Sequence, residues 1–367
     1  MNMKKEKVLV AMSGGLDSSI ACVLLQEQGY EVYGVTLKIW DQDDKPLGCK
    51  EISIGGEQDI KDACEVAERL GIQHFVVDVR TSFENSVIKN FMDEYMEGRT
   101  PNPCTLCNKM IKWDAVLQKA DELQCKYIAT GHFSQIEVEN NRFFVRKGLD
   151  PLKEQSYMLW QLSQNDLSRT LFPLGKLTKA RIREIAIEHG LDFVASKGES
   201  FDICFVPDQD YRMYLKRKIP TQVEKFRQGN FVDKTGKFLG HHDGYMFFTI
   251  GQRKGLPAMG FRAYVNEIRP STNEVVIGHE EELLMSKLQF HSMNLMKVEA
   301  LDETKPVTVK LRYHHVGELA YIHTFENGTS GEIQFDVPVQ AITPGQSAVF
   351  YLDDDLLGGA IIGKVLE

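Results

Sequence analysis

Long apolar runs are missing from this chain. None of the apolar stretches in its 367 residues approaches the roughly 20 residues that a membrane-spanning helix needs. Residues 1–10 contain lysines but neither an apolar segment of about 7–15 residues nor a small-residue cleavage site, which a secretory signal would have. The sequence therefore predicts a cytoplasmic protein without a membrane partner.

Cysteine is too scarce and too irregularly spaced for a disulfide scaffold, with seven among 367 residues. In a chain without a secretory signal, an odd number of cysteines is typical of a reducing cytosol, where a conspicuous cysteine is more often catalytic or metal-bound than structural. Cys22, Cys64 and Cys125 lie in or beside apolar helical stretches, so we expect them in the core. Cys49 stands in a polar segment, and the sequence assigns it no role. The remaining three are Cys104, Cys107 and Cys204.

Positive charge is in deficit, because 43 Lys and Arg face 52 Asp and Glu for a net charge of −9. This balance argues weakly against a nucleic-acid partner. RNA recognition, however, needs a local phosphate-binding groove rather than a basic whole. Residues 208–227 hold six bases against three acids. The residues that would extend this segment into a basic stripe are Arg146, Lys147, Lys153, Arg253 and Lys254.

Strand-like and helix-like segments alternate along the first two hundred residues, which predicts an α/β fold with a parallel sheet covered on both faces. In residues 57–70 apolar side chains recur at helical spacing before Gly71, a helix-ending signal. The expected order is strand 7–12, helix 18–28, strand 31–37, helix 57–70, strand 74–79, helix 82–98, helix 109–123, strand 126–130, hairpin 136–146 and helix 178–189.

The pattern changes after residue 207, where glycine and proline become dense. Strands are then expected at 307–312, 318–325, 332–337, 347–352 and 360–365, with turn signals at 327–328 and 344–345 between them. The length suits two or three domains. We expect an α/β domain over residues 1–207, a small middle module over 208–284 and a C-terminal antiparallel barrel or sandwich over 285–367.

A glycine loop, SGGLDSS at residues 13–19, stands between the first strand and the first helix. Glycines let the backbone approach an anion, and a helix N-terminus offers unpaired N–H groups. Asp17 is suited either to cap the helix or to help hold Mg²⁺. The loop could also be an ordinary glycine-serine turn. Its position after the first parallel strand favours the ligand site.

The loop lacks the GK[ST] ending of a Walker A sequence and does not match GxGxxG. It resembles instead the SGGxDS loop of ATP pyrophosphatases, which split ATP between its α and β phosphates and adenylate a carbonyl-type oxygen. This resemblance implies the chemistry but does not choose the substrate.

Two cysteine-bearing segments lie far apart in the chain. Cys104 and Cys107 follow a proline-rich loop at an expected helix start, where the helix dipole and Lys109 and Lys112 would favour a thiolate. Cys204 stands where the α/β domain is expected to end. A zinc site is disfavoured because no second CxxC accompanies this pair, and a thioredoxin-like redox pair is disfavoured because the pair does not follow a strand. An iron–sulfur cluster on all three cysteines and a two-thiol sulfur-transfer site remain open.

A series of segments is similar to the tRNA-specific 2-thiouridylase family, in the family's order and over nearly the whole chain. The segments are SGGLDSS (13–19), TPNPCTLCNKMIKW (100–113), ATGHF (129–133), LKEQSYML (152–159), FDICFVP (201–207), HHDGYMFFTIGQRKGL (241–256) and LRY (311–313). The resemblance implies an adenine-nucleotide hydrolase-like N-terminal domain and a C-terminal β-barrel. It implies that sulfur replaces the 2-oxygen of the wobble uridine after ATP has adenylated that oxygen.

The family's residues transfer onto this chain position by position. By the resemblance, Cys204 carries a persulfide, Cys107 is the nucleophile, a disulfide bond belongs to the cycle and Asp17 joins the catalytic set. ATP and Mg²⁺ are the implied cofactors, tRNA and a persulfide-carrying donor protein are the implied partners, and no resident metal is expected. The implied ATP site is Ala11, Met12, Ser13, Gly14, Gly15, Leu16, Asp17, Ser18, Leu37 and Gly131. The implied tRNA contacts are Asn102, Pro103 and Cys104 at the target base, then Lys153, Glu154, Gln155, Arg312 and Tyr313.

The chain departs from the family at three of these positions. Many relatives carry an acid in place of Cys104, which puts one contact to the base in question and favours the cluster alternative. Relatives often carry Asp at the position of Glu154 and Met at the position of Leu37. Two other functions stay open: a small-molecule amide synthetase with the same loop, which would not need Cys107 and Cys204, and a non-catalytic nucleotide- or RNA-binding module.

Overall fold

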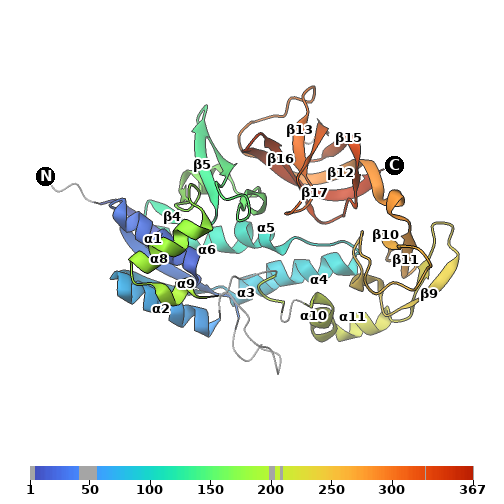
Figure 1. Ribbon diagram of the computed structural model, residues 1–367, viewed down its shortest axis with the longest axis horizontal. Helices are drawn as coiled ribbons and strands as arrows, with labels where there is room; N and C mark the ends of the chain where they lie inside the picture. Colours follow the sequence, from blue (N-terminus) through green and yellow to red (C-terminus); the bar gives the residue numbers. More distant parts are fainter. Residues whose placement is uncertain (1–4, 41–55, 198–202, 207–209, 327, 367) are drawn as a thin grey trace.

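The N-terminal half of the chain (blue to green in Figure 1) folds around a parallel five-stranded sheet of order β3-β2-β1-β4-β7. The computed structural model describes residues 5–40, 56–197, 203–206, 210–326 and 328–366, so Cys49 lies outside the described residues. The sheet strands are β1 (Lys7–Ala11), β2 (Glu31–Lys38), β3 (Gln73–Asp78), β4 (Tyr127–Ala129) and β7 (Thr170–Leu171). The predicted parallel sheet is confirmed.

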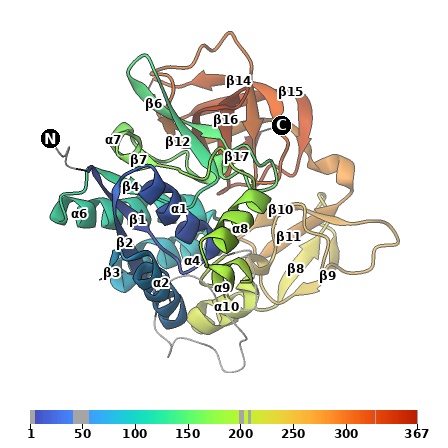
Figure 2. The same cartoon turned by 60° about the vertical axis from the view of Figure 1, so that its left-hand side comes forward.

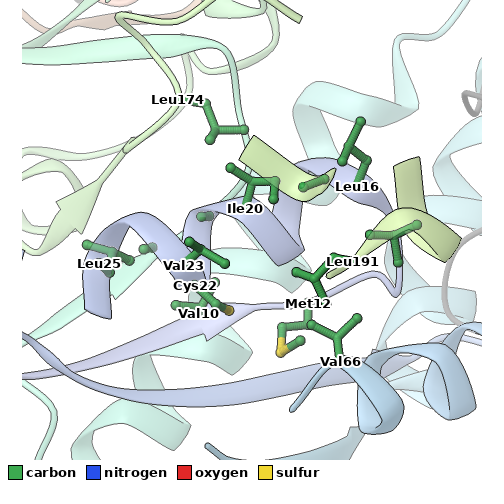
Figure 3. Packing of buried hydrophobic residues seen from close by; sticks show 14 of the residues in the cluster. Val10, Met12, Leu16, Ile20, Cys22, Val23, Leu25, Val66, Leu174 and Leu191 are labelled. Atoms are coloured by element: carbon green, nitrogen blue, oxygen red, sulfur yellow. The ribbon is translucent and has the colours of Figure 1, made fainter. Parts of the chain in front are cut away.

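Alternating residues of β1 bury against opposite layers of helices. Val8 and Val10 pack in a cluster with residues of α1, α2, α8 and α9, part of which Figure 3 shows. Leu9 packs instead with residues of α6. Helix α8 lies alongside α1 (Figure 2). A strand buried on both faces reads as a continuous apolar run, as this one does. The helices are α1 (Leu16–Glu27), α2 (Glu57–Leu70), α6 (Asp114–Glu122), α7 (Gln164–Ser168), α8 (Lys179–Glu188) and α9 (Asp192–Ala195).

Two helical stretches differ from the sequence prediction. The helix expected at 109–123 begins six residues earlier, because α5 (Pro103–Cys107), the π-helical segment η3 (Asn108–Trp113) and α6 run on without a break. Proline at the first helical position needs no N–H partner, which makes Pro103 a favourable start. The helix expected at 82–98 is built in the same manner from α3 (Arg80–Phe83), η2 (Glu84–Ile88) and α4 (Lys89–Met96).

The middle of the chain forms two short helices and a four-stranded sheet of order β10-β11-β8-β9. This sheet and the helices α4 and α10 bury a common apolar cluster, so the middle module packs directly against the N-terminal domain. The elements are α10 (Tyr211–Lys218), α11 (Pro220–Lys225), β8 (Gly229–Val232), β9 (Phe238–His242), β10 (Tyr264–Arg269) and β11 (Glu274–Gly278).

The C-terminal strands close into a six-stranded antiparallel barrel, because β12 pairs with both β15 and β17. The sequence left a barrel and a sandwich open, and the closure decides for the barrel. The strand order is β12-β15-β14-β13-β16-β17. The strands are β12 (Leu284–Leu295), β13 (Val307–Lys310), β14 (Glu318–Thr324), β15 (Gly331–Gln340), β16 (Ser347–Leu352) and β17 (Asp355–Leu366).

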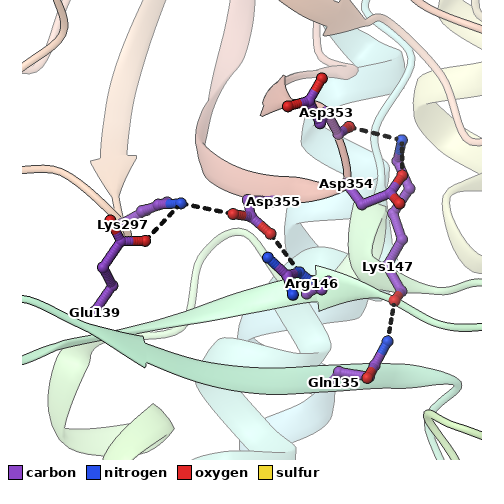
Figure 4. A network of polar contacts seen from close by, with 8 residues as sticks. All are labelled: Gln135, Glu139, Arg146, Lys147, Lys297, Asp353, Asp354 and Asp355. Carbon is purple, nitrogen blue, oxygen red and sulfur yellow. Dashed lines mark hydrogen bonds and ion pairs between the residues drawn. The ribbon is translucent and has the colours of Figure 1, made fainter.

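The predicted hairpin, β5 (Ser134–Glu139) and β6 (Arg142–Lys147), leaves the N-terminal sheet and joins the barrel at β17. Asn140 and Asn141 form its turn with positive φ, as expected. Arg146 binds Asp355 at 2.5 Å, and Lys147 binds Asp354 at 3.2 Å (Figure 4). These two cations therefore fasten the hairpin to the barrel, and their place in a basic stripe stays a prediction.

The core predictions for cysteine hold at two of three positions. Cys22 and Cys125 are buried, but Cys64 is exposed on α2, with its sulfur 3.4 Å from His74 Nδ1. Cys64 sits at the edge of the apolar face of α2, whose buried residues are Ala63, Val66 and Ala67. The helical spacing correctly placed Cys64 next to the buried face of α2, but that face covers fewer residues than the spacing predicted. No helix in the described ranges is both long and apolar enough to span a membrane.

Candidate active site

The glycine loop links the end of β1 to the start of α1 and is held by its own serines. The backbone N–H of Ser13 donates to Ser18 Oγ at 3.1 Å, and Ser18 Oγ donates to the carbonyl of Gly15 at 3.2 Å. Gly14 has a φ of +69°, and a Cβ there would lie 2.5 Å from the carbonyl oxygen of Asp59. Both the backbone angle and this close contact require glycine, so the loop has one defined shape.

The other residues of the predicted ATP site meet the loop at the carboxyl edge of the sheet. The hydroxyl of Thr36, next to Leu37 on β2, donates to the carbonyl of Met12 at 3.0 Å. Gly131, just after β4, lies so close that a Cβ there would be 2.8 Å from the backbone of Asp17 and Ser18. The structure thus brings together the loop, the end of β2 and the turn after β4, which is where parallel sheets bind ligands.

Two lysines that the sequence analysis did not single out bind this loop. Lys179, buried at the start of α8, places Nζ 2.6 Å from Asp17 Oδ1. Lys197 donates from Nζ to the carbonyl of Gly14 at 2.8 Å and pairs with Asp62 of α2. Lysine is a common phosphate ligand, so the loop carries positive charge beside its N–H groups. Each lysine is one of many in the chain, and only the fold reveals which of them reach residues 14–17.

The thiols of Cys107 and Cys204 lie in one apolar cluster between α4, the helix of residues 103–113 and the middle module. Cys107 is buried and Cys204 is half-buried. Burial raises the pKa of the Cys107 thiol to about 11, and burial also raises the pKa of Cys204, with further raising contributions from Cys107 and Cys104. The three cysteines are therefore close enough to influence one another's charge.

The predicted thiolate-favouring environment of Cys107 is wrong for this arrangement. Because the helix begins at Pro103, Cys107 lies beyond its first turn and inside the apolar cluster. Desolvation outweighs the positive charge of Lys112, which lowers the pKa of this thiol only in part. Lys109, the other predicted contributor, is exposed.

We call the apolar cluster around Cys107 and Cys204 the thiol pocket, and the sheet edge that carries the predicted ATP site the nucleotide edge. The charge of Lys112 influences groups in both. This charge lowers the pKa of Cys107, of Cys204 and of His132, which directly follows Gly131. Burial, with this charge as the second cause, lowers the pKa of His132 to about 3, so the ring is neutral. Thr130 Oγ1 lies 2.7 Å from His132 Nδ1, and Trp113 and Phe172 surround the ring. The two regions are thus neighbours across one helix.

Comparison with known proteins gives one consistent result along the chain. Residues 6–208 match a family model described as a tRNA methyl transferase HUP domain, 213–279 a tRNA methyl transferase PRC-barrel domain, and 281–362 an aminomethyltransferase beta-barrel domain. A tRNA-specific 2-thiouridylase MnmA of Salinibacter ruber is 48% identical and covers 99% of this chain and 95% of its own length. Proteins of that name from Amoebophilus asiaticus (48% identical; 98% and 96% covered) and, as MnmA 2, Clostridium tetani (48%; 99% and 100%) match equally. The chain belongs to the tRNA-specific 2-thiouridylase family.

Membership in the thiouridylase family agrees with the three-part fold: a HUP-type parallel sheet, a middle PRC-barrel-like unit and a closed C-terminal barrel. It also confirms the resemblance that the sequence segments indicated. The family models are described by methyl transfer, whereas the full-length relatives are named for thiolation.

The stretch predicted to contact the target base in this thiouridylase is fixed from two sides. Asn102 Nδ2 lies 3.9 Å from Met158 Sδ, and Pro103 is buried. From the barrel, Gln346 Nε2 donates to the carbonyls of Thr100 at 3.1 Å and of Pro101 at 2.9 Å. Cys104 is half-buried on the first turn of α5.

The two other stretches predicted to contact tRNA in this thiouridylase, 153–155 and 312–313, meet although they are far apart in sequence. Tyr313 donates its hydroxyl to the carbonyl of Glu154 at 2.7 Å. Glu154 is buried and accepts from the backbone of Ser156, while Gln155 Oε1 accepts from the backbone of Phe133 at 3.0 Å. Lys153 is half-buried, and Arg312, next to Tyr313, is exposed.

The cysteines do not fit an iron–sulfur cluster in this arrangement. Within the described part of the chain, no three His, Cys, Asp or Glu side chains come together in a group that could hold a metal ion. The trio of Cys104, Cys107 and Cys204 therefore does not form such a ligand set.

One buried polar group next to Cys107 in the chain was missed by the sequence analysis. Asn108 follows Cys107, donates from Nδ2 to the carbonyl of Met158 at 2.8 Å, and has no partner for Oδ1 among the residues that the structure describes. A buried acceptor without a partner is costly, and such groups are frequent in functional sites. The sequence contained no pattern that distinguishes this asparagine from the other asparagines of the chain.

Proposed function

We propose that this chain is an ATP-dependent tRNA-uridine 2-sulfurtransferase of the cytoplasm that thiolates the wobble uridine through an adenylated uridine and a cysteine persulfide. In this proposal residues 1–207 form the catalytic domain, 208–284 a tRNA-contacting middle module and 285–367 the barrel. The observation that supports it most is that one helical stretch carries both Cys107, in the cluster with Cys204, and Trp113, whose ring lies 5.8 Å from that of His132 beside the predicted ATP site. A nucleotide and a persulfide would then act on one base.

The first step makes a poor leaving group into a good one. The 2-oxygen of uracil attacks the α-phosphorus of ATP, the bond to the β-phosphate oxygen breaks, and pyrophosphate leaves. The loop N–H groups and serine hydroxyls at residues 13–18 would hold the phosphates, and Lys179 and Lys197 would offset the charge that develops on pyrophosphate. Gly131 lets the turn after β4 approach the loop without a side chain between them.

Mg²⁺ fits this donor set only as an ion carried mainly by the phosphates. The loop offers a single carboxylate, Asp17, together with the hydroxyls of Ser13 and Ser18, and Mg²⁺ is commonly bound by one or two carboxylates plus substrate phosphates. When bound, the ion would neutralise phosphate charge. Asp17 would hold it, and Lys179 would keep that carboxylate in place.

The second step transfers sulfur. The terminal sulfur of a persulfide on Cys204 attacks carbon 2 of the base, and AMP leaves with the original oxygen. The Cys107 thiolate then attacks the inner sulfur of Cys204, which frees the thiouridine and forms a Cys107–Cys204 disulfide. A thiol reductant supplies the two electrons that restore both thiols, and a donor protein supplies the next persulfide.

Target-base and tRNA contacts complete the proposal. Asn102, Pro103 and Cys104 would contact the base that has been turned out of the anticodon loop. Lys153, Glu154 and Gln155 with Arg312 and Tyr313 would contact the tRNA, with Lys153 and Arg312 as the charged contacts. The remaining members would act by shape, since Glu154, Gln155 and Tyr313 already bind within the protein.

The test is mass analysis of nucleosides from unmodified tRNA incubated with the protein, ATP, Mg²⁺ and a sulfide or persulfide source. We expect 2-thiouridine and one pyrophosphate per thiouridine. A small-molecule amide synthetase would remain fully active as Cys107→Ser and Cys204→Ser, and a non-catalytic binding module would release no pyrophosphate in the presence of tRNA. Methylated rather than thiolated uridine would also overturn the proposal.

A further inference from the structure

An open cavity of about 740 Å³ lies in the middle module, and its lining includes no residue of the glycine loop and neither Cys107 nor Cys204. Its lining combines one residue of α10 with a four-residue loop that precedes β10. The lining residues are Arg212, Gly251, Gln252, Arg253 and Lys254. Three of the five are cations, in a protein with a net charge of −9.

These three cations, Arg212, Arg253 and Lys254, form no ion pair with an acid of the described ranges, unlike a number of other cations in the chain. By contrast, Arg99 binds Glu94 at 2.7 Å, and Arg146 binds Asp355 at 2.5 Å. Three like charges around one hollow repel one another, so an anion that enters the hollow relieves a cost already present in the fold.

The loop that carries two of the cations has a fixed shape. The N–H of Gly251 donates to the carbonyl of Val265 at 2.8 Å, and Gln252 Nε2 donates to the carbonyl of Lys254 at 2.7 Å. Gly251 has a φ of +83°, and a Cβ there would lie 2.9 Å from Ala341 Cβ of the barrel. The loop therefore needs glycine at this point and presents its charges from a rigid backbone.

Aromatic rings support both arginines. The Arg253 guanidinium lies 5.6 Å from the ring centre of Tyr264, and that of Arg212 lies 5.9 Å from the ring centre of Tyr211. Tyr211 is itself stacked on Tyr95 of α4 at 4.6 Å. An arginine held on a ring loses less side-chain freedom on binding, and its planar group matches a phosphate with two hydrogen bonds.

The cavity borders the stretch that would contact the target base. Thr249, two residues before Gly251, accepts at Oγ1 from Thr100 Oγ1 at 3.3 Å. Thr100 begins the loop that leads to Asn102 and Cys104, and Gln346 of the barrel fixes the same loop. A polynucleotide whose base reaches Asn102 thus has neighbouring phosphates within the region of the three cations.

From this geometry we infer that the cavity binds a backbone phosphodiester of the tRNA substrate beside the target uridine, with Arg212, Arg253 and Lys254 as its ligands. The inference rests on the proposed function for its choice of ligand. It accounts for RNA binding by an acidic chain, because the attraction needs only a local set of unpaired cations. It also gives the middle module a positioning role.

The test measures the affinity of full-length protein for unmodified tRNA over a series of salt concentrations. The variant Arg212→Gln/Arg253→Gln/Lys254→Gln is compared with Arg181→Gln/Lys126→Gln/Lys305→Gln, which removes the same charge from exposed, acid-paired sites. We expect the cavity variant to bind roughly 10- to 100-fold more weakly near 0.15 M salt and to lose about 0.7 of salt-dependence slope per contact. The control should stay near wild type.

A second variant, Arg253→Lys/Lys254→Arg, keeps both charges and should keep most of the slope, which separates charge from folding. Equal affinity and slope in the cavity variant and the control would overturn the inference. So would unchanged tRNA affinity with a loss of sulfur delivery from the donor protein, because the cavity would then be a protein-docking site. The proposed function is tested separately by the thiolation assay, and wild-type protein that makes no thiouridine would count against that function. The binding measurements test only the phosphate site.

Discussion

The nucleotide edge and the thiol pocket are neighbours, but the first is lined by polar and charged groups and the second by apolar side chains. The edge consists of glycines, serine hydroxyls and two lysines that bind loop oxygens. The pocket consists of aromatic and aliphatic side chains around two thiols whose pKa burial raises. In the proposed function, the first would stabilise an anionic leaving group, and the second would keep water from a reactive sulfur. The difference indicates that adenylation and sulfur transfer should fail separately when each region is altered.

The largest separation is expected from Cys204→Ser. Thiouridine formation should fall by at least about 10³-fold, since the proposed persulfide carrier is lost. Pyrophosphate release that depends on tRNA should remain within a few-fold of wild type, because the nucleotide edge is unchanged. Parallel nucleoside and pyrophosphate assays measure both. Cys22→Ser, at a buried thiol in the N-terminal core, serves as the control for a simple loss of packing.

The opposite separation is expected from Lys179→Met. This change removes the cation bound to Asp17 at 2.6 Å, and pyrophosphate release should fall by about 10²-fold. Alkylation of Cys107 should be unaffected. Lys179→Arg should recover part of the rate, while Lys176→Met, at an exposed lysine three residues earlier, should change nothing. A Lys179→Met enzyme with wild-type pyrophosphate release would remove the lysine from the nucleotide edge.

A smaller effect should appear in the chemistry of the thiol pocket. With the pKa of Cys107 raised to about 11, its alkylation by iodoacetamide in tRNA-free protein should rise about tenfold per pH unit from pH 8 to pH 10. Lys112→Met removes the charge that lowers this pKa, so the rate at pH 8 should drop further. Lys109→Met, on the exposed side of the same helix, is the matched control. Fragment mass spectrometry localises the label, and a midpoint at or below pH 8.5 would contradict the buried thiol.

The smallest effect concerns stability in the middle module, outside both regions. Burial lowers the pKa of His242 to about 4, and its Nδ1 accepts from the N–H of Gly244 at 3.0 Å. A histidine with a depressed folded-state pKa contributes its stability above the unfolded value near 6.5, and the contribution is lost as pH falls toward 4. Between pH 7.5 and pH 5 we expect a loss of about 2 kcal/mol from this group.

Denaturant unfolding at the two pH values checks the prediction. His242→Asn keeps an acceptor for Gly244 and removes the titrating ring, so its stability should depend less on pH than that of wild type. His241→Asn alters the exposed neighbour and should retain the wild-type dependence. Equal pH dependence in all three proteins would show that His242 is not the responsible group.

The elements with strong local signals were predictable from the sequence. Helix α2 ends at Gly71 in the left-handed conformation, as its glycine signal indicated. The loop at 13–19 was identified from its sequence motif. The position of Gly131 against Asp17 follows from parallel strands that end at one edge. In each of these cases a residue type is required by backbone shape or by a close approach.

The remainder depends on contacts between distant segments. Nothing local marks Lys179 or Lys197 as loop ligands, since each acts through a residue more than a hundred positions away. The burial of Cys107 was missed because the helix start was expected six residues too late, which put the thiol at a favourable helix end. The pairing of Arg146 with Asp355 was missed for the same physical reason, because the partner of this arginine lies on a barrel strand that is distant in sequence.

The pairing of β6 with β17 has a consequence for synthesis on the ribosome. Asp355 is translated 209 residues after Arg146, its partner. At roughly 5–20 residues per second, the hairpin waits on the order of 10–40 s with an unpaired edge. Any nascent chain that stalls before the last strand leaves this edge open to other chains, so loss of the final dozen residues should harm the first half of the protein as well as the barrel.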